Sequence, residues 1–225
     1  MRAVPDLQTD VHVFTTGDKC LEDVLCIFAD KITVHEKNLS DPRVLPLTTV
    51  DSLLKGDDGW DFCLYLEDDL IVQDPFYIDK YSWFTHQTEH RFALMPHRRE
   101  PTVHNTPKQL FVDGPIVRND NCASYRSGDE DIVASGAFWG EQIKFVNASN
   151  PHSGSFCLSS QQLSALRSAQ WPPEEFVGPL ETAATGTVMS TFSVLKPAWE
   201  NRYFLTVEHG NPSFLSLIGQ LPLAS

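Results

Sequence analysis

The stretch DFCLYLEDDLIVQDP, residues 61–75, carries the strongest fold signal in the sequence. Apolar and aromatic residues fill positions 62–66, which is typical of a buried strand. The strand pattern runs directly into three acids, Glu67, Asp68 and Asp69, and a second apolar run follows them. Like charges repel one another, and burying them without a partner costs free energy. The sequence therefore predicts a positively charged partner at this turn.

Strand and helix patterns alternate ahead of this stretch. Residues 11–16 have the pattern of a buried strand, and apolar residues spaced as on one helix face follow between 21 and 28. A second strand pattern covers 31–36, and a short helix pattern covers 50–54. The order strand, helix, strand, helix, strand favours a mostly parallel central sheet flanked by helices. We therefore expect an α/β, Rossmann-like fold.

Further element signals continue to the end of the chain. The pair Asp74-Pro75 is typical of a helix start, and Ser159 with Gln162 resembles a capping box before another helix. Strand patterns at 108–117 and 138–147 could pair as a smaller antiparallel part. No repeat or linker interrupts the chain, so we expect a single domain over residues 1–225 with its core at about 11–214.

The charge balance excludes one class of partner. The 225 residues carry 17 Lys and Arg against 30 Asp and Glu, which gives a formal net charge of −13. Such a surface repels a phosphate backbone, so nucleic acid is not expected as a partner. A small anion can still bind where a metal ion or a few basic side chains attract it locally.

The cysteines and the apolar runs bear on location. The five cysteines show no paired or metal-binding spacing, and an odd number of thiols fits a reducing compartment. No apolar signal core and no apolar run of about 18 residues is present, so no transmembrane segment is expected. We therefore expect a soluble, cytoplasmic chain.

The acidic turn at 67–69 predicts a metal site. Open α/β sheets place ligands at the carboxyl ends of their strands, which is where these acids stand in the expected fold. A divalent cation would remove their mutual repulsion, and hard oxygen ligands suit Mn²⁺ or Mg²⁺. The alternative is a solvated acidic turn. The apolar runs on both sides favour the cation.

The segment YLEDDLIVQDP resembles the DXD-type motif of GT-A fold glycosyltransferases, with Glu in place of the first Asp. The resemblance implies a GT-A-like domain that binds Mn²⁺ or Mg²⁺ and a nucleotide-sugar donor of the UDP or GDP type. By position, Asp69 is then the metal ligand, and Glu67 reaches the ribose or the sugar. Asp68 belongs to the same nucleotide-sugar-binding turn.

Two later segments fit the same resemblance. The segment NPHSGSFCLS (150–159) resembles the glycine-containing segment that precedes the acceptor-side helix in inverting members, which implies that Ser153 and Gly154 contact the nucleotide-sugar. An ordinary turn is the alternative. His209 resembles the C-terminal His or acid that many members supply to the metal, and a plain surface histidine is the alternative.

Glu181 is the expected catalytic base. The segment GPLETAAT places it in the first turn of a helix, which resembles the position of the base in inverting GT-A enzymes. The alternative is structural. With Gly178 as the cap, Glu181 is the third helical residue, where a capping box and the helix dipole favour Glu for stability alone.

The remaining candidates belong to the nucleotide. The base and ribose are expected beside the loop after the first strand, at Thr15, Thr16 and Asp18. Arg43 and the basic segment PHRR (96–99) could meet a phosphate or an acidic acceptor, although each would also suit a solvated surface.

These signals together predict a metal-dependent glycosyltransferase of the hexosyltransferase type. It would transfer a sugar, with inversion, to a hydroxyl group of a glycan or glycoconjugate. A nucleotidyltransferase remains an alternative, although FTTGDKCLED is a poor match to the glycine-rich basic loop that such enzymes carry. A non-catalytic module that binds a nucleotide-sugar is the other alternative.

Overall fold

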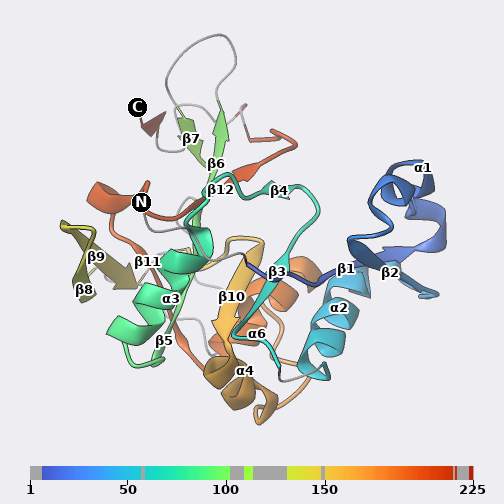
Figure 1. The fold of residues 1–225 in the computed structure, drawn as a ribbon, viewed down its shortest axis with the longest axis horizontal. Coiled ribbons are helices and arrows are strands. Elements are labelled where there is room, and N and C mark those ends of the chain that lie inside the picture. The colour runs from blue at the N-terminus through green and yellow to red at the C-terminus, as the bar shows by residue number, and fades with distance from the viewer. Residues whose placement is uncertain are drawn as a thin grey trace.

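A computed structural model describes residues 7–56, 59–101, 109–113, 131–147, 150–214, 216 and 223–224. Its strands form a parallel pair, an antiparallel pair, a four-stranded sheet and a five-stranded sheet. Figure 1 shows the two pairs toward the right and the centre, with the two larger sheets to the left and above.

The first part of the chain forms a unit that extends to one side of the molecule (Figure 1). Strands β1 (Val11–Thr16) and β2 (Ile32–Lys37) pair in parallel, as the alternating pattern predicted. The expected helix between them is reduced to a short piece, and none of its residues is buried. Its elements are η1 (Gly17–Lys19), α1 (Glu22–Leu25) and η2 (Cys26–Phe28).

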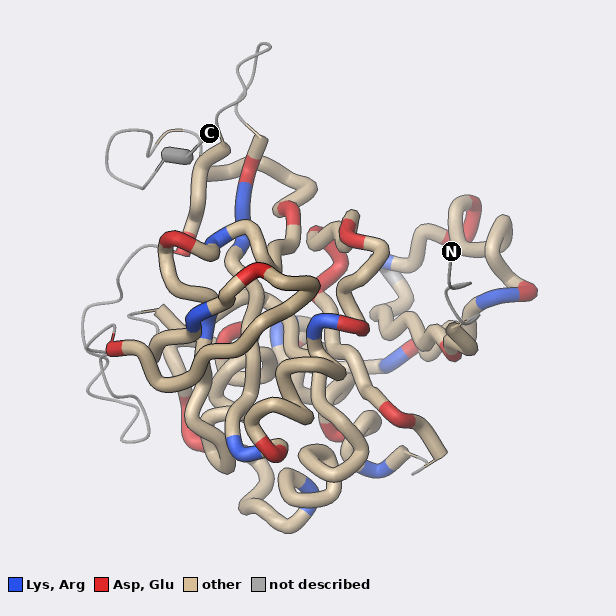
Figure 2. Tube along the Cα trace, turned by 60° about the vertical axis from the view of Figure 1, so that its left-hand side comes forward, with Lys and Arg blue, Asp and Glu red and all other residues tan. Residues whose placement is uncertain are grey.

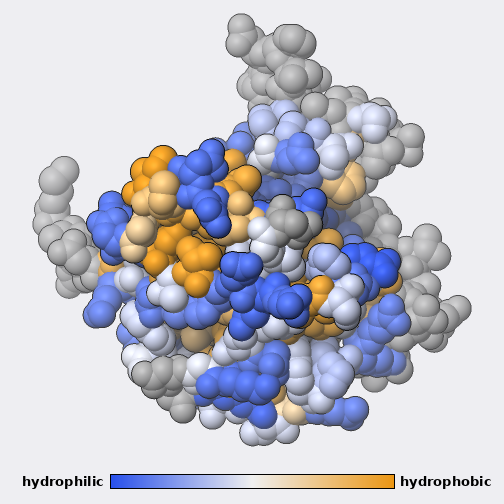
Figure 3. All heavy atoms as spheres, turned by 90° about the vertical axis from the view of Figure 1, so that its right-hand side faces the viewer, coloured by the Kyte–Doolittle hydropathy of each residue, from blue (hydrophilic) through white to orange (hydrophobic). Residues whose placement is uncertain are grey.

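The apolar side chains of this unit face outward. Parallel sheets normally have both faces covered by other elements. Here Leu21 is 63% exposed, Ile27 70% and Phe28 47%, and Val34 on β2 is exposed as well. Figure 3, which views the molecule from this side, shows an extended apolar area. The face of the unit is therefore open among the described residues.

The stretch that opened the sequence analysis forms the centre of the molecule. Strand β3 (Phe62–Leu66) pairs antiparallel with β10 (Ser155–Ser159). The predicted capping box at Ser159 and Gln162 is confirmed at the start of α4 (Ser160–Arg167). The segment before β3 folds as η3 (Pro42–Val44) and α2 (Leu45–Leu54).

The four-stranded sheet has the order β5-β11-β9-β8. Strands β8 (Ile132–Phe138) and β9 (Glu141–Asn147) form an antiparallel hairpin, β11 (Ser193–Pro197) pairs antiparallel with β9, and β5 (Phe92–Leu94) pairs in parallel with β11. Helix α3 (Tyr77–Gln87) packs its buried face toward this sheet and β10.

The five-stranded sheet has the order β13-β7-β6-β12-β4. Only β12 and β6 pair in parallel, and the other neighbours are antiparallel. Backbone hydrogen bonds from Met95 to Leu195 (2.9 Å) and from His97 to Leu205 (3.1 Å) carry the chain from the four-stranded sheet into this one. Its strands are β13 (Leu223–Ala224), β7 (Gln109–Phe111), β6 (His97–Pro101), β12 (Thr206–His209) and β4 (Leu70–Ile71).

The expectation of a mostly parallel, Rossmann-like or GT-A-like sheet is wrong. Within the described part of the chain, antiparallel pairings outnumber parallel ones, and the parallel pairs lie in three different sheets. The main reason is β10, whose residues were expected in a glycine-containing segment before a helix, with an ordinary turn as the alternative and no strand. Because β10 covers one edge of β3 in the antiparallel direction, the expected parallel neighbour is replaced by a strand from about 90 residues later in the chain.

The last helical region begins at Gly178-Pro179 as predicted. It consists of α5 (Pro179–Glu181), a π-helical turn η4 (Thr182–Gly186) and α6 (Thr187–Met189). All five residues of η4 are buried. A short turn, η5 (Trp199–Asn201), leads from β11 toward β12.

Two clusters of buried side chains form the core. One cluster joins α3 to the larger sheets through Tyr81, Phe84, Phe145 and Leu195. Phe204 belongs to this cluster and makes edge-to-face ring contacts with Phe145 and with Trp83, which packs against the cluster. The other cluster lies around β3, β10 and the last helices, and it includes Val50, Phe156, Leu158 and Val188.

The remaining sequence expectations have mixed outcomes. Acidic positions are spread over the described chain rather than gathered on one face (Figure 2). The strand expected at 108–117 is confirmed over β7, and its end beyond residue 113 lies outside the described residues, as does Cys122. The four described cysteines are free thiols. No helix in the described ranges is long and apolar enough to cross a bilayer. The single-domain expectation stays a prediction.

We expect Phe145→Ala to lower the free energy of unfolding by about 3–5 kcal/mol, because it leaves a cavity among close-packed rings. Phe145 is 1% exposed and contacts Phe84 and Phe204. Phe28→Ala is the matched control, since Phe28 is 47% exposed, and its effect should stay within about 1 kcal/mol. Urea denaturation of both variants measures the difference, and equal losses would contradict the assigned core.

Candidate functional site

The acidic turn lies between β3 and β4, where the central pair meets the five-stranded sheet. Two backbone hydrogen bonds fix its shape. Leu70 N donates to Glu67 O at 3.1 Å, and Glu67 N donates to Gly154 O at 3.1 Å. The turn is therefore closed on itself and attached to the residues that precede β10.

One of the two carboxylate oxygens of Glu67 has no hydrogen-bond partner among the described residues. Its Oε1 atom is buried and accepts no hydrogen bond from any described residue. Burial raises the pKa of Glu67 to about 7, Arg98 opposes that rise, and the carboxylates of Asp69, Glu181 and Asp68 add to it. Glu67 therefore exchanges a proton near neutral pH, whereas Asp68 is exposed to solvent.

Gly154 is required by this carboxylate. Its φ of +64° is a conformation that side chains disfavour, and a Cβ atom there would lie 2.7 Å from Glu67 Oε2 and 2.9 Å from Leu70 Cδ1. The close approach that the sequence suggested is thus to Glu67 itself. Ser153 is fully buried and donates its hydroxyl to Ser155 O at 2.8 Å, so its side chain supports the loop.

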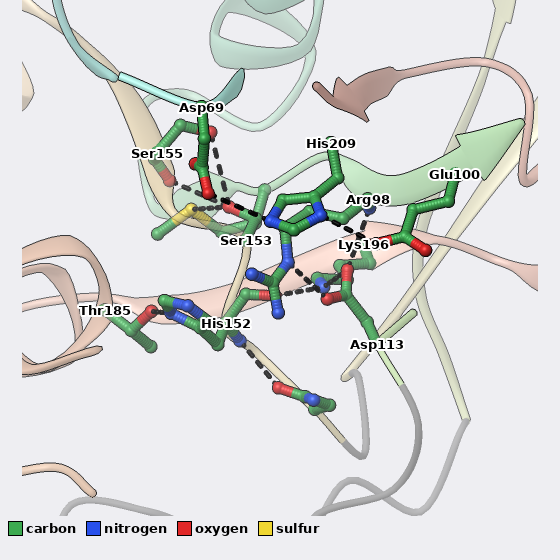
Figure 4. Close-up of polar contacts among 12 residues, drawn as sticks. Asp69, Arg98, Glu100, Asp113, His152, Ser153, Ser155, Thr185, Lys196 and His209 are labelled. Carbon is green, nitrogen blue, oxygen red and sulfur yellow. Dashed lines mark hydrogen bonds and ion pairs between the residues drawn. The ribbon is translucent and has the colours of Figure 1, made fainter. Parts of the chain in front are cut away.

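Asp69 and His209 lie side by side, although 140 residues separate them. His209 Nε2 is 3.0 Å from Asp69 Oδ2, and its Nδ1 is 2.7 Å from Glu100 Oε1 (Figure 4). Glu100 is completely buried and also accepts hydrogen bonds from the backbone of Ser213 and Phe214. His209 is therefore buried between two carboxylates and is not a surface histidine.

The strand register explains this contact. In the antiparallel pairing of β12 with β4, His209 stands opposite Leu70, directly after Asp69. Gly210 N donates to Asp69 O at 2.6 Å and closes the corner. The two predicted metal ligands are thus adjacent. No set of three or more His, Cys, Asp or Glu side chains within the described ranges forms a ready metal cage, so the metal stays a prediction.

A buried ion-pair cluster lies behind the acidic turn (Figure 4). Asp113 Oδ1 accepts from Arg98 Nε at 2.8 Å, and Asp113 Oδ2 accepts from Lys196 Nζ at 2.8 Å. Burial alone would raise the pKa of Asp113, but Lys196 and Arg98 hold it well below its usual range. Burial lowers the pKa of Lys196, which also donates to His152 O. The cluster links β6, β11 and the end of β7.

His152 is buried and uncharged at neutral pH. Its Nδ1 is 2.9 Å from Thr185 Oγ1, and its backbone N–H donates to Asn150 Oδ1. Burial first, and then the positive charge of Arg98, lower the pKa of His152 to about 3. The neutral ring therefore joins the loop before β10 to the buried π-helical turn.

The side chain of Glu181 makes no capping hydrogen bond at the start of α5. Gly178 does begin the helix, but its backbone N–H donates to Phe176 O at 2.7 Å. This N–H is therefore not donated to Glu181, as a capping box would require. Glu181 makes no hydrogen bond with any described residue, and its negative charge helps to raise the pKa of Glu67. These contacts weigh against the capping box, whereas Glu181 does lie in the first turn of α5, where the helix dipole favours an acid.

Two of the expected nucleotide residues, Thr15 and Arg43, bond to neighbours along the chain. Thr15 is buried at the end of β1 and donates to Thr16 O, and Thr16 is buried beside it. Asp18 lies in η1, and its side chain is outside the described residues. Arg43 is exposed and paired with Asp41, although η3, which carries Arg43, contacts α5.

The sequence analysis missed Glu100, Asp113, His152 and Lys196. A lysine inside the apolar run SVLKP is a signal, because a buried ammonium requires a carboxylate partner. Asp113 shows the pattern of the acidic turn, an acid that directly follows an apolar strand. Neither signal names the partner, because the contacting residues are about 80 positions apart.

Comparisons of this chain with protein-family models, with curated proteins and with solved structures found no match.

Stability should fall as the pH falls below about 6.5, partly because of His152. The pKa of His152 is about 3 in the folded protein, against 6.5 for the ordinary group, so the unfolded chain binds more protons between these values. We expect a loss of about 1 kcal/mol from this residue between about pH 7 and pH 5.5.

Urea denaturation at the two pH values measures this loss, and His152→Asn should reduce it by about 1 kcal/mol. His86→Asn is the control, because His86 lies on the exposed face of α3. An equal pH dependence in wild type and His152→Asn would contradict the assignment.

Proposed function

We propose that this protein is a metal-dependent glycosyltransferase that transfers a sugar from a nucleotide-sugar to a hydroxyl group. One observation carries the proposal. Glu67, Asp69 and Glu181 keep carboxylate oxygens available in one place, and His209 lies against Asp69 at 3.0 Å. A buried carboxylate oxygen without a partner, such as Oε1 of Glu67, is costly, so its retention favours a role in binding or catalysis.

In this proposal, Asp69 and His209 would hold a divalent cation beside Glu67, although the described residues form no ready set of three ligands. The orphaned Oε1 of Glu67 is a hard oxygen ligand, and Asp69 with His209 supplies an oxygen and a nitrogen. Glu100 holds His209 Nδ1, and Nε2, which lies 3.0 Å from Asp69 Oδ2 in this structure, would be the ligand atom, the arrangement common behind metal-bound histidines. Mn²⁺ or Mg²⁺ held by Asp69 and His209 would neutralise charge on the departing nucleoside diphosphate.

Glu181 is the proposed base. It would take the proton from the acceptor hydroxyl while the acceptor oxygen forms a bond to the anomeric carbon. The bond from that carbon to the donor phosphate breaks at the same time, and its electron pair leaves with the nucleoside diphosphate. Attack opposite the departing group inverts the anomeric centre. Glu67 would accept a hydrogen bond from a hydroxyl of the ribose or the donor sugar.

The proposal rests on the site, because the fold expected from the same family resemblance is wrong. We expect a UDP- or GDP-sugar of the hexose type as the donor and a glycan or glycoconjugate as the acceptor. The free thiols described above support a cytoplasmic location, which is part of the proposal.

Asp69→Asn should weaken the binding of a UDP- or GDP-sugar at least tenfold with Mn²⁺ and little in EDTA, because it removes one charged metal ligand. Calorimetric titration of the candidate donors under both conditions measures the effect. Asp79→Asn, an exposed acid on α3, is the matched control and should bind as wild type. Equal losses with Mn²⁺ and in EDTA would show that the acids are structural.

Glu181→Gln should keep donor binding and melt close to wild type, yet transfer sugar at least about a hundredfold more slowly. Donor hydrolysis by water can serve as the assay while the acceptor is sought. Glu175→Gln, an exposed change in the preceding loop, is the control. Wild-type rates in Glu181→Gln would remove Glu181 as the base, and donor binding without any turnover in wild type would indicate a non-catalytic binding module.

A further inference from the structure

The basic residues near the acidic turn differ in how many of their hydrogen-bond donors are already used. Arg99 donates to Gln73 at 3.1 Å and lies 3.6 Å from Glu208. Lys196 Nζ donates both to Asp113 and to His152 O. His97 cannot serve as a cation, because burial lowers its pKa to about 4. The side chains of His97, Arg99 and Lys196 therefore already have hydrogen-bond partners within the protein.

Arg98 is different. Its side chain is 12% exposed, and only Nε donates to a protein acceptor, Asp113 Oδ1 at 2.8 Å. The two terminal nitrogens make no hydrogen bond to any described residue. A guanidinium has five N–H donors, so four remain for a ligand. Figure 4 shows this guanidinium in the polar cluster with Asp113, His152 and His209.

The cluster carries a surplus positive charge toward the acidic turn. Arg98 and Lys196 share a single carboxylate, Asp113. Burial would lower the pKa of Arg98, but Asp113, Glu67 and Asp69 together raise it above its ordinary value. The positive charge of Arg98 therefore acts on Glu67, which the proposed function places against the donor, and on Asp69, which it gives to the metal.

The position of the guanidinium is fixed from two sides. Asp113 Oδ2 accepts from the backbone N–H of Arg98 at 2.9 Å, while Oδ1 accepts from Nε of the same residue. Lys196 anchors the other side of that carboxylate and is 1% exposed. A guanidinium held in this way loses little further conformational freedom when it binds an anion.

We infer that Arg98 binds a phosphate group of the nucleotide-sugar donor, and that Asp113 and Lys196 are positioning residues that hold its guanidinium for this purpose. The inference rests on the proposed function and names the residue that recognises the diphosphate. Arginine suits this role, because its planar fork matches phosphate oxygens. A chain with a net charge of −13 attracts an anion only where a metal ion or a basic side chain does so locally.

Inorganic pyrophosphate is the probe, because it carries the diphosphate chemistry without a base or a sugar. Calorimetric titration of folded wild-type protein, with Mg²⁺ and in EDTA, gives the reference affinities. Arg98→Gln should weaken binding at least tenfold under each condition where wild type binds. Arg98→Lys should fall between the two, because it keeps the charge and loses the fork. Arg91→Gln, a loop residue whose side chain is 66% exposed, should bind as wild type.

Asp113→Asn tests the positioning role and should also weaken pyrophosphate binding, while retaining sensitivity to Mg²⁺. The Arg98 variants decide the question even if Asp113→Asn does not fold. Wild-type affinity in Arg98→Gln, or no pyrophosphate binding by wild type, would overturn the inference. If wild type turns over a nucleotide-sugar and Arg98→Gln binds pyrophosphate as wild type does, the inference about Arg98 is overturned. The proposed function then still stands. Arg98-dependent binding without turnover of any donor would support the anion site and count against the transferase.

Discussion

The carboxylate of Asp113 is the constraint on which the arrangement of the site depends. It lies 3% exposed between Arg98 and Lys196, on strands of the two larger sheets. Removing such charges from water costs several kcal/mol per ion, and breaking the set by losing one member leaves an unpaired buried charge. The two sheets can therefore meet only where all three groups are brought together. The loop before β10 is attached to this junction by the hydrogen bond that Lys196 donates to His152 O.

The acidic turn is tolerated for related reasons. Its three acids differ sharply in environment: Asp68 is solvated, Asp69 lies against His209, and Glu67 is half-buried with a pKa of about 7. The positive group that acts on Glu67 is the guanidinium of Arg98. It does not satisfy Glu67 Oε1. An incompletely satisfied carboxylate in a rigid surrounding is typical of a functional site, where local stability is sacrificed for chemistry.

The fold was only partly predictable. Local signals were reliable: the apolar run of β3, the capping box at Ser159 and the helix start at Gly178-Pro179 all appear where expected. The wrong sheet assignment has a specific origin in β10. Its sequence, SFCLS, is short and follows a glycine, so a turn and a fully buried strand look alike. Only its pairing with β3 distinguishes them, and that pairing joins segments about 90 residues apart.

For the site, the sequence by itself determined which groups are chemically conspicuous: the acids at 67–69, a histidine after a strand pattern, and a glutamate in a helix's first turn. The tertiary structure decided which of them meet. It placed His209 against Asp69 and Gly154 against Glu67, and it paired Thr15 and Arg43 with neighbours along the chain. Within the basic segment at 96–99, it also paired His97 with Pro197 O and Arg99 with Gln73, which leaves Arg98 as the side chain with donors to spare. The physical reason is that residue type is local, whereas burial, pairing and field depend on strands brought together from distant parts of the chain.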